Sequence, residues 1–169
     1  MSYVLKVCVI GDGAVGKTSL IIRYTEGHFR ESYLMTVGTS FAVKALDLDG
    51  TQVKLQLWDL AGQPHFSSVR PVFYRGSVGG LLVYDVTRRE TFNNIHVWFN
   101  EFTQVTGTLP FILLANKTDL VDQRQVTKEE GEAYAQKNGW DYFETSAKEG
   151  RGVNEAFRLI ALKVVGKGG

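Results

Sequence analysis

The chain has 169 residues, of which 44% are hydrophobic, 22% charged and 12% aromatic. This length and composition exclude a mainly disordered chain, so we expect one folded domain over residues 1–169. Lysine and arginine total 19 against 18 acidic residues, and the net charge of +1 gives no reason to expect a nucleic acid partner. A single cysteine, Cys8, excludes an internal disulfide and fits a reducing, cytoplasmic compartment.

Short apolar runs alternate with segments of helical period. This pattern predicts an α/β fold, a mostly parallel sheet with helices on both faces. The expected strands are residues 4–10, 41–48, 52–58, 81–86, 111–116 and 140–145. Asp49-Gly50 separates the second and third strands and is typical of a tight hairpin, so these two strands are expected to be antiparallel.

The expected helices fill the gaps between strands. One follows residues 11–18 and covers 18–26, and the capping-box form of Thr127 to Glu130 is expected to open another. Apolar residues at helical spacing mark two packing faces, and Trp98 is expected to pack as well. These faces are Phe92, Ile95, Phe99 and Phe102, and Val153, Ala156, Phe157, Ile160, Ala161 and Val164. Segments near 27–39 and 60–76 show neither period and are long for connections, which indicates functional loops.

The loop after the first strand is the most informative motif. Residues 11–18 read Gly-Asp-Gly-Ala-Val-Gly-Lys-Thr and fit the phosphate-loop pattern GxxxxGK[ST]. Glycines let backbone N–H groups approach a polyphosphate, and the following helix directs its positive N-terminal dipole at the anion. Lys17 would reach the phosphate oxygens, and the Thr18 hydroxyl would bind Mg²⁺. The expected phosphate-binding residues in this loop are Gly13, Ala14, Val15, Gly16, Lys17, Thr18 and Ser19.

A second segment, Trp58 to Gln63, follows the third expected strand. Asp59 stands where a second Mg²⁺ ligand or water-holding carboxylate belongs. The N–H of Gly62 is expected to approach a γ-phosphate, and the Gln63 amide is suited to orient an attacking water. We therefore expect Gln63 and Lys17 to be the catalytic residues.

Two further strand ends are suited to read a base. Asn116-Lys117-Thr118-Asp119 follows one apolar strand, and Ser146-Ala147-Lys148 follows another. The Asp119 carboxylate can accept hydrogen bonds from N1–H and N2–H₂ of guanine but would repel the N1 lone pair of adenine. A backbone N–H near Ala147 can donate to guanine O6, and the stems of Lys117 and Lys148 can cover the base. The sequence therefore predicts guanine selectivity.

Together these segments resemble the small GTPases of the Ras superfamily over roughly residues 3–165. Three runs are most similar to the Rab branch, namely residues 54–59 (KLQLWD), 73–76 (FYRG) and 82–87 (LVYDVT). The resemblance implies a P-loop GTPase fold whose six-stranded sheet has one antiparallel strand. It also implies a Mg²⁺-dependent switch that hydrolyses GTP to GDP and alternates between effector-binding and inactive states.

The resemblance assigns roles to the first non-periodic segment as well. Phe29 would pack against the base, Tyr33 would fold over the phosphates, and Thr36 would bind Mg²⁺ and the γ-phosphate. Effectors are expected to contact residues near 28–41 and 60–76. Loss of the γ-phosphate would remove contacts to Thr36 and Gly62, so both loops would loosen. An exchange factor and a GTPase-activating protein are expected, because residues 21–35 are too few to hold an insertion with its own arginine finger. The protein is expected to be a monomer.

Several departures from the Rab pattern bear on function. Residues 36–41 read Thr-Val-Gly-Thr-Ser-Phe, so no particular Rab partner is carried over. Pro64 follows Gln63 and fixes the backbone there, which leaves an alternative, a nucleotide-dependent binding module with little or no hydrolysis. A nucleotide kinase or ATPase is a third hypothesis. It predicts an acceptor-binding lid with clustered arginines, which we do not find in the sequence, and it leaves Asp119 without a role. The C-terminus carries no prenylation cysteine, so the expected location is cytoplasmic, and peripheral on membranes only if a lipidated tail follows.

Overall fold

The computed structural model describes residues 2–27, 39–60 and 68–168. Its strands are β1 (Ser2–Ile10), β2 (Thr39–Leu48), β3 (Thr51–Leu60), β4 (Gly79–Asp85), β5 (Phe111–Asn116) and β6 (Asp141–Glu144). Its helices are α1 (Lys17–Glu26), α2 (Arg70–Tyr74), α3 (Arg89–Asn93), α4 (Ile95–Thr106), α5 (Lys128–Asn138), α6 (Val153–Gly168) and the short 3₁₀ helix η2 (Val121–Gln123). Every expected strand is present, with bounds that differ by at most a few residues.

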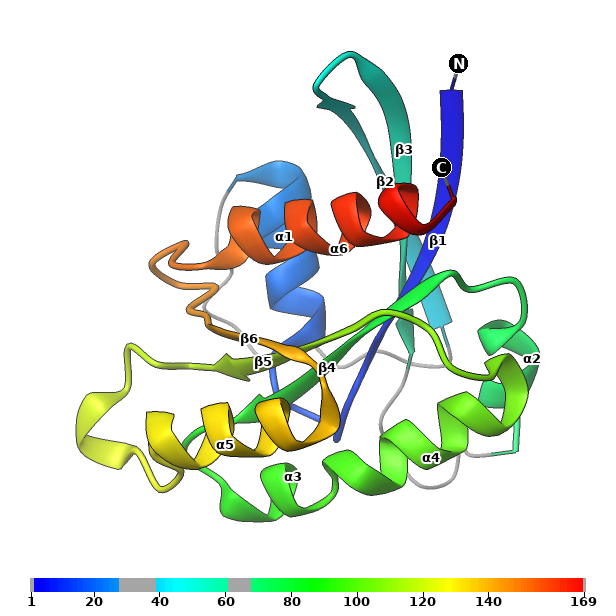
Figure 1. Cartoon of the computed structure of the whole chain (residues 1–169). Coiled ribbons are helices and arrows are strands. Elements are labelled where there is room, and N and C mark those ends of the chain that lie inside the picture. The colour runs from blue at the N-terminus through cyan, green and yellow to red at the C-terminus, as the bar shows by residue number, and fades with distance from the viewer. Residues whose placement is uncertain (1, 28–38, 61–67, 169) are drawn as a thin grey trace.

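The strands form a six-stranded sheet in the order β2-β3-β1-β4-β5-β6 (Figure 1). Only β2 runs antiparallel to its neighbour β3, and the pairs β1–β3, β1–β4, β4–β5 and β5–β6 are parallel. The hairpin turn places Asp49 at φ 52° and Gly50 at φ 96°, the left-handed conformations that a type I′ turn requires. The strand order and directions confirm the predicted α/β fold. The parallel pairings bring the carboxyl ends of β1, β3, β4, β5 and β6 to one edge of the sheet.

Helices cover both faces of this sheet and enclose two hydrophobic cores. On one face, α1 and α6 pack over the sheet, and the rings of Tyr24 and Phe157 stack with centroids 4.5 Å apart. On the other face, Phe102 of α4 packs against Phe111 and Tyr74. Every residue of β4 and of β5 is buried, which explains why these strands are apolar without alternation.

Two expected elements differ in detail. The apolar face that begins at Phe92 is divided at Asn94 into the short α3 and the longer α4, although Phe92 and Phe102 both pack against the second core. The segment expected to be a loop over 60–76 contains α2, whose five residues are too few to show a helical period. The capping box at the start of α5 is confirmed, since Thr127 Oγ1 accepts from the Glu130 N–H and the Glu130 carboxylate accepts from the Thr127 N–H.

Cys8 of β1 is fully buried within the second core. Its Sγ is 3.2 Å from the Ser77 hydroxyl, and burial raises the pKa of the thiol to about 11. The thiol is therefore protonated near neutral pH and has the environment of a packing residue.

Within the described residues, none of the helices has the length and apolar character needed to cross a membrane.

Candidate nucleotide site

The phosphate-loop residues 11–18 connect the carboxyl end of β1 to the first turn of α1. Two of the glycines permit close contacts with other strands. A Cβ on Gly16 would lie 2.4 Å from the Asn116 amide nitrogen, and one on Gly11 would lie 2.2 Å from the Val83 carbonyl oxygen. Gly16 also has φ 101°, a conformation that side chains disfavour. Gly11 and Gly16 are thus required by the close approach of this loop to β4 and β5.

Lys17 lies in the curve of this loop and is only 5% exposed. Its Nζ donates to the carbonyl oxygens of Gly11 (3.0 Å) and Asp12 (2.8 Å). Burial lowers the pKa of Lys17 to about 8, against the opposing effect of the Asp59 and Asp12 carboxylates. A buried ammonium group held mainly by carbonyl oxygens is suited to receive a phosphate as its counter-anion.

The two predicted metal ligands in the described residues lie together. The Thr18 hydroxyl donates a hydrogen bond to Asp59 Oδ2, joining the start of α1 to the end of β3. Asp59 is buried, and both side chains present oxygen atoms, the ligand type that Mg²⁺ prefers. The donor set therefore fits a Mg²⁺ ion between these residues.

The two predicted base-reading loops also converge. Ser146 Oγ donates to Asp119 Oδ1 at 2.9 Å, and the same hydroxyl accepts from the backbone N–H of Glu149. Thr145 Oγ1 donates to the Asn116 side-chain oxygen at 3.0 Å. These bonds hold the loop after β5 against the loop after β6, so Asp119, Ser146 and the buried Ala147 lie in one neighbourhood.

Asn116 and Lys117 connect these loops to the phosphate loop. The Asn116 amide donates to the Val15 carbonyl at 2.9 Å, and Lys117 Nζ donates to the Ala14 carbonyl at 2.9 Å. Lys117 also lies 3.0 Å from the Asp85 carboxylate. Burial alone would raise the pKa of Asp85, but hydrogen bonds from Thr87 and the Lys117 cation hold it below its ordinary value. Asp85 is therefore a buried anion that anchors Lys117.

Sequence reasoning missed Asp85 as well as a second contact to the phosphate loop. The Asp12 carboxylate accepts from Trp98 Nε1 at 2.7 Å and from the Asn94 amide at 2.8 Å. Trp98 was expected only to pack, and no local pattern connects it to a residue 86 positions earlier. The start of α4 is thereby fixed to the phosphate loop.

Five predicted site residues lie outside the described residues. They are Phe29, Tyr33, Thr36, Gly62 and Gln63. Of the other predicted residues, Ser19 is half-buried on the first turn of α1, and Lys148 is exposed on the turn after β6.

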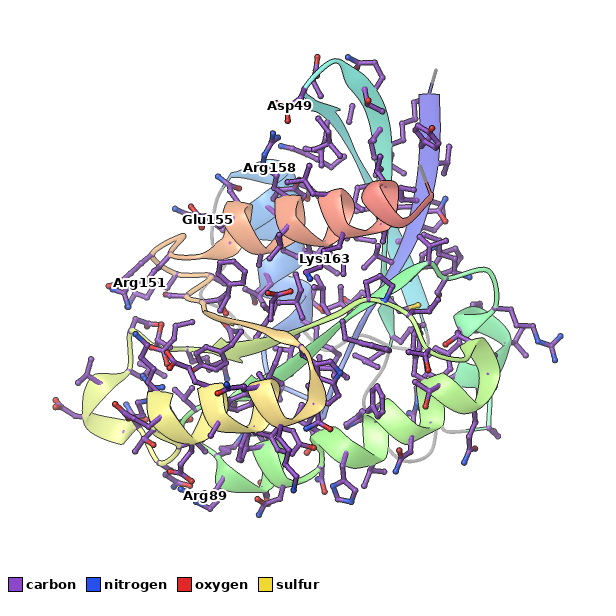
Figure 2. All side chains as sticks on the ribbon, viewed as in Figure 1. Asp49, Arg89, Arg151, Glu155, Arg158 and Lys163 are labelled. Carbon is purple, nitrogen blue, oxygen red and sulfur yellow. The ribbon has the colours of Figure 1, made fainter. Side chains whose placement is uncertain are left out.

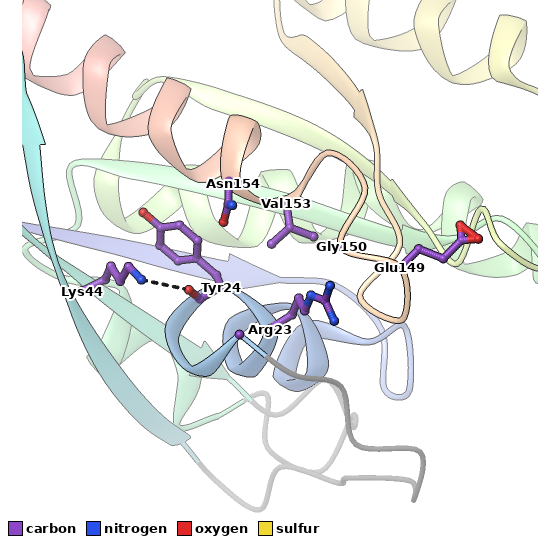
Figure 3. Close-up of a pocket in the computed structure, with 8 residues that line it drawn as sticks. Arg23, Tyr24, Lys44, Glu149, Gly150, Val153 and Asn154 are labelled. Atoms are coloured by element: carbon purple, nitrogen blue, oxygen red, sulfur yellow. Dashed lines mark hydrogen bonds between the residues drawn. The ribbon is translucent and has the colours of Figure 1, made fainter.

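A separate cleft of about 350 Å³ lies where the carboxyl end of α1 meets β2 and the turn before α6 (Figure 3). Its walls include Arg23, Lys44 and Asn154. Lys44 Nζ donates to the Tyr24 carbonyl at 3.3 Å, and Arg23 lies against the backbone of Gly150. None of the predicted site residues that the structure describes lines this cleft.

The comparisons with known proteins agree with this arrangement. Residues 6–166 match the model of the Ras family. The chain is also similar to the Ras-related protein RGP2 of rice (Oryza sativa subsp. japonica), with 41% identity over 166 residues that cover 98% of this chain and 76% of that protein. The chain therefore belongs to the Ras family of small GTPases, which bind GTP and hydrolyse it to GDP.

Proposed function

We propose that this chain is a Rab-like molecular switch that binds effectors while GTP is bound and releases them after hydrolysis. The convergence at one sheet edge of a phosphate loop, the Thr18–Asp59 pair and the Asp119–Ser146 pair carries this proposal. Each unit serves a different part of a guanine nucleotide, and together they account for triphosphate, metal and base.

The assigned roles follow the chemistry of each group. The phosphates are bound by the loop residues Gly13 to Ser19, which include Lys17. The guanine is bound by residues of the two base-reading loops, namely Asn116, Lys117, Asp119, Ser146, Ala147 and Lys148. Thr18 and Asp59, with Thr36, would hold Mg²⁺, which neutralises charge on the phosphate oxygens when bound. Phe29, Tyr33 and Gly62 contact the nucleotide as the family resemblance implies. Gln63 orients the attacking water, and we expect slow hydrolysis that an external activating protein accelerates.

An effector surface is supported by an aromatic row that joins the two proposed effector-binding segments. Phe41 of β2 stacks on Trp58 of β3 at 4.9 Å, and Trp58 lies 5.9 Å from Phe73 of α2. Phe41 is 55% exposed, so this row offers apolar area to solvent. Phe41 belongs to the segment 28–41 and Phe73 to the segment 60–76, so a partner seated on the row would contact residues of both segments.

Base selectivity provides the first test. Asp119→Asn exchanges one acceptor oxygen for an amide donor, which matches the C2 carbonyl of xanthine better than the amine of guanine. We expect the variant to lose GDP affinity by at least about 100-fold and to gain affinity for xanthosine diphosphate. Competition binding with the two nucleotides measures both changes. Unchanged guanine preference would contradict the assigned role of Asp119.

Hydrolysis provides the second test, because Pro64 supports the alternative of a binding module without catalysis. Phosphate release under single-turnover conditions is to be compared between the wild type and Gln63→Leu. A switch that hydrolyses GTP predicts a slow but measurable wild-type rate and a lower rate in the variant. Equal rates near zero would favour the binding module, and rapid release by the isolated wild type would contradict the need for an activating protein.

A further inference from the structure

Three consecutive carbonyl groups of the phosphate loop each accept one hydrogen bond from a distant side chain. Arg88 Nη2 donates to Gly13 O at 2.8 Å, Lys117 Nζ to Ala14 O at 2.9 Å, and Asn116 Nδ2 to Val15 O at 2.9 Å. Asn116 and Lys117 stand in the expected base-reading motif. Arg88 stands outside every predicted motif, in the turn between β4 and α3.

These contacts fix the direction of the N–H groups as well. In a planar trans peptide the C=O and the next residue's N–H point in opposite directions. A donor that holds the Gly13 carbonyl on one side therefore directs the Ala14 N–H to the other side. Within the described residues, no group accepts a hydrogen bond from the N–H of Ala14, Val15 or Gly16. Three adjacent donors are thus left for an anion.

Arg88 is held in place by its own turn. Its Nε lies 3.3 Å from Asp85 Oδ2, the carboxylate that also pairs with Lys117. The other oxygen of Asp85 accepts from both the N–H and the hydroxyl of Thr87. The guanidinium of Arg88 thereby connects the buried Asp85 carboxylate to the phosphate loop, and it uses a different nitrogen atom for each contact.

We infer that Arg88 is a positioning residue for phosphate binding, because it orients the Gly13–Ala14 peptide so that the Ala14 N–H faces the nucleotide. This inference rests on the proposed function, and it adds a residue of the β4–α3 turn to the phosphate-binding machinery. Arg88 itself touches the loop carbonyl, and its effect on the nucleotide passes through the peptide that it holds.

The next residue supplies a matched control. Arg89 carries the same charge, but its guanidinium binds Glu130 and the Gln125 carbonyl (Figure 2 shows Arg89 beside α5). Arg89 Nη1 lies 2.7 Å from Glu130 Oε2, and no described contact joins it to the phosphate loop. Changing either arginine to methionine keeps the linear stem and removes the donors, so a comparison of the two separates loop positioning from net charge.

The test measures dissociation of fluorescent GDP from the Mg²⁺-loaded protein together with ³¹P NMR of the bound nucleotide. Arg88→Met should release GDP about tenfold faster, since one charge-assisted hydrogen bond is lost, and should shift the β-phosphate resonance. Arg89→Met should match the wild type in both readouts. Arg88→Lys should fall between wild type and Arg88→Met, because a single ammonium group cannot replace both guanidinium contacts.

Three results would overturn the inference. The first is that Arg88→Met releases GDP at the same rate as Arg89→Met and shows the same ³¹P shifts. The second is a lysine variant that releases GDP as slowly as the wild type, because charge alone would then suffice. The third, which decides the matter if Arg88→Met does not fold, is an unmoved β-phosphate resonance in Arg88→Lys with faster release. Failure of the wild type to retain GDP would instead contradict the proposed function, so the two outcomes are distinguishable.

Discussion

At the scale of single residues, Gly131 shows how a missing side chain permits packing. It lies in the interior of α5, where glycine is unfavourable for the helix. A Cβ at this position would lie 2.4 Å from the Tyr84 hydroxyl oxygen and 2.5 Å from a ring carbon of Tyr142. The glycine therefore lets α5 approach two tyrosines on the sheet.

Replacing Gly131 by alanine should lower the free energy of unfolding. We expect a loss of about 1–3 kcal/mol from overpacking, measured by urea denaturation of the GDP-bound protein. Gly166 of α6 is the control, since a Cβ there would meet no atom within 4 Å. Gly166→Ala should be neutral or should stabilise the protein by up to about 1 kcal/mol. Equal effects at both sites would contradict the packing explanation.

The Glu130 carboxylate of the capping box contributes to the stability of the folded protein in a way that depends on pH. Hydrogen bonds from Arg89, and then from the Thr127 backbone, lower the pKa of Glu130 from 4.5 to about 2. A carboxyl whose pKa is depressed by folding stabilises the folded state above its unfolded pKa, and this contribution is lost as the pH falls towards the folded pKa.

The melting temperature of the wild type should therefore exceed that of Glu130→Gln at pH 6, and the difference should shrink between pH 4.5 and about 2. Thermal denaturation followed by circular dichroism measures this difference at each pH. The side chain is exposed, so we expect a small effect. A difference that stays constant over this range would show that the ionised carboxylate has no role in the cap.

At the scale of elements, α2 is attached to α4 by an ion pair between the buried Arg70 and the half-buried Glu101. Arg70 is 5% exposed, and its guanidinium donates through Nε and Nη2 to both oxygens of Glu101, each at 3.0 Å. It also lies 4.4 Å from the Trp98 ring centroid. Trp98 in turn donates to Asp12, so one side chain of α4 contacts both α2 and the phosphate loop.

A double-mutant cycle measures this attachment. Arg70→Met and Glu101→Gln should each destabilise the protein, and the double variant should lose less than the sum, with a coupling energy of about 1–3 kcal/mol. The reason is that either single change already removes the hydrogen bonds between Arg70 and Glu101, so the second change removes less. The exposed Arg75 serves as the control, and Arg75→Met should show no coupling to Glu101→Gln. Strict additivity for Arg70 and Glu101 would contradict a direct interaction.

At the scale of the whole molecule, the site is assembled from loops that lie far apart in the sequence, so ligand binding should stabilise the fold as a unit. A ligand that binds only the folded state adds about 4 kcal/mol when present at 1,000 times its Kd. Saturating GDP with Mg²⁺ should therefore raise the melting temperature of the wild type, and EDTA should reverse part of the increase.

Asp59→Ala should reduce the portion of the increase that EDTA reverses, because it removes one of the two metal-ligand candidates joined in the Thr18–Asp59 pair. Differential scanning fluorimetry with GDP, with and without EDTA, measures the effect. Asp47→Ala, in the β2–β3 hairpin away from the site, is the control and should respond to EDTA as the wild type does. An EDTA effect of full size in Asp59→Ala would show that Asp59 does not hold the metal.

Structural features that depend on a short stretch of residues could be predicted from the sequence. The range of β5, the Asp49-Gly50 hairpin and the Thr127 capping box each follow from a short pattern of backbone or packing preferences, and the structure agrees with all three. The contact from Arg88 to Gly13 joins residues 75 positions apart, and no period or motif marks it. Such contacts depend on how the strands are ordered in the sheet, which apolar spacing alone does not determine.

The burial of Cys8 has a practical consequence for studying the protein. It is the one cysteine among the 169 residues, and its thiol is fully enclosed with a pKa near 11. A maleimide reagent needs an accessible thiolate, so the native chain should remain unlabelled under folding conditions. A second cysteine on the surface, for example at the exposed Val72 that precedes Phe73 in α2, would then accept a single fluorophore at a known position without any prior removal of Cys8.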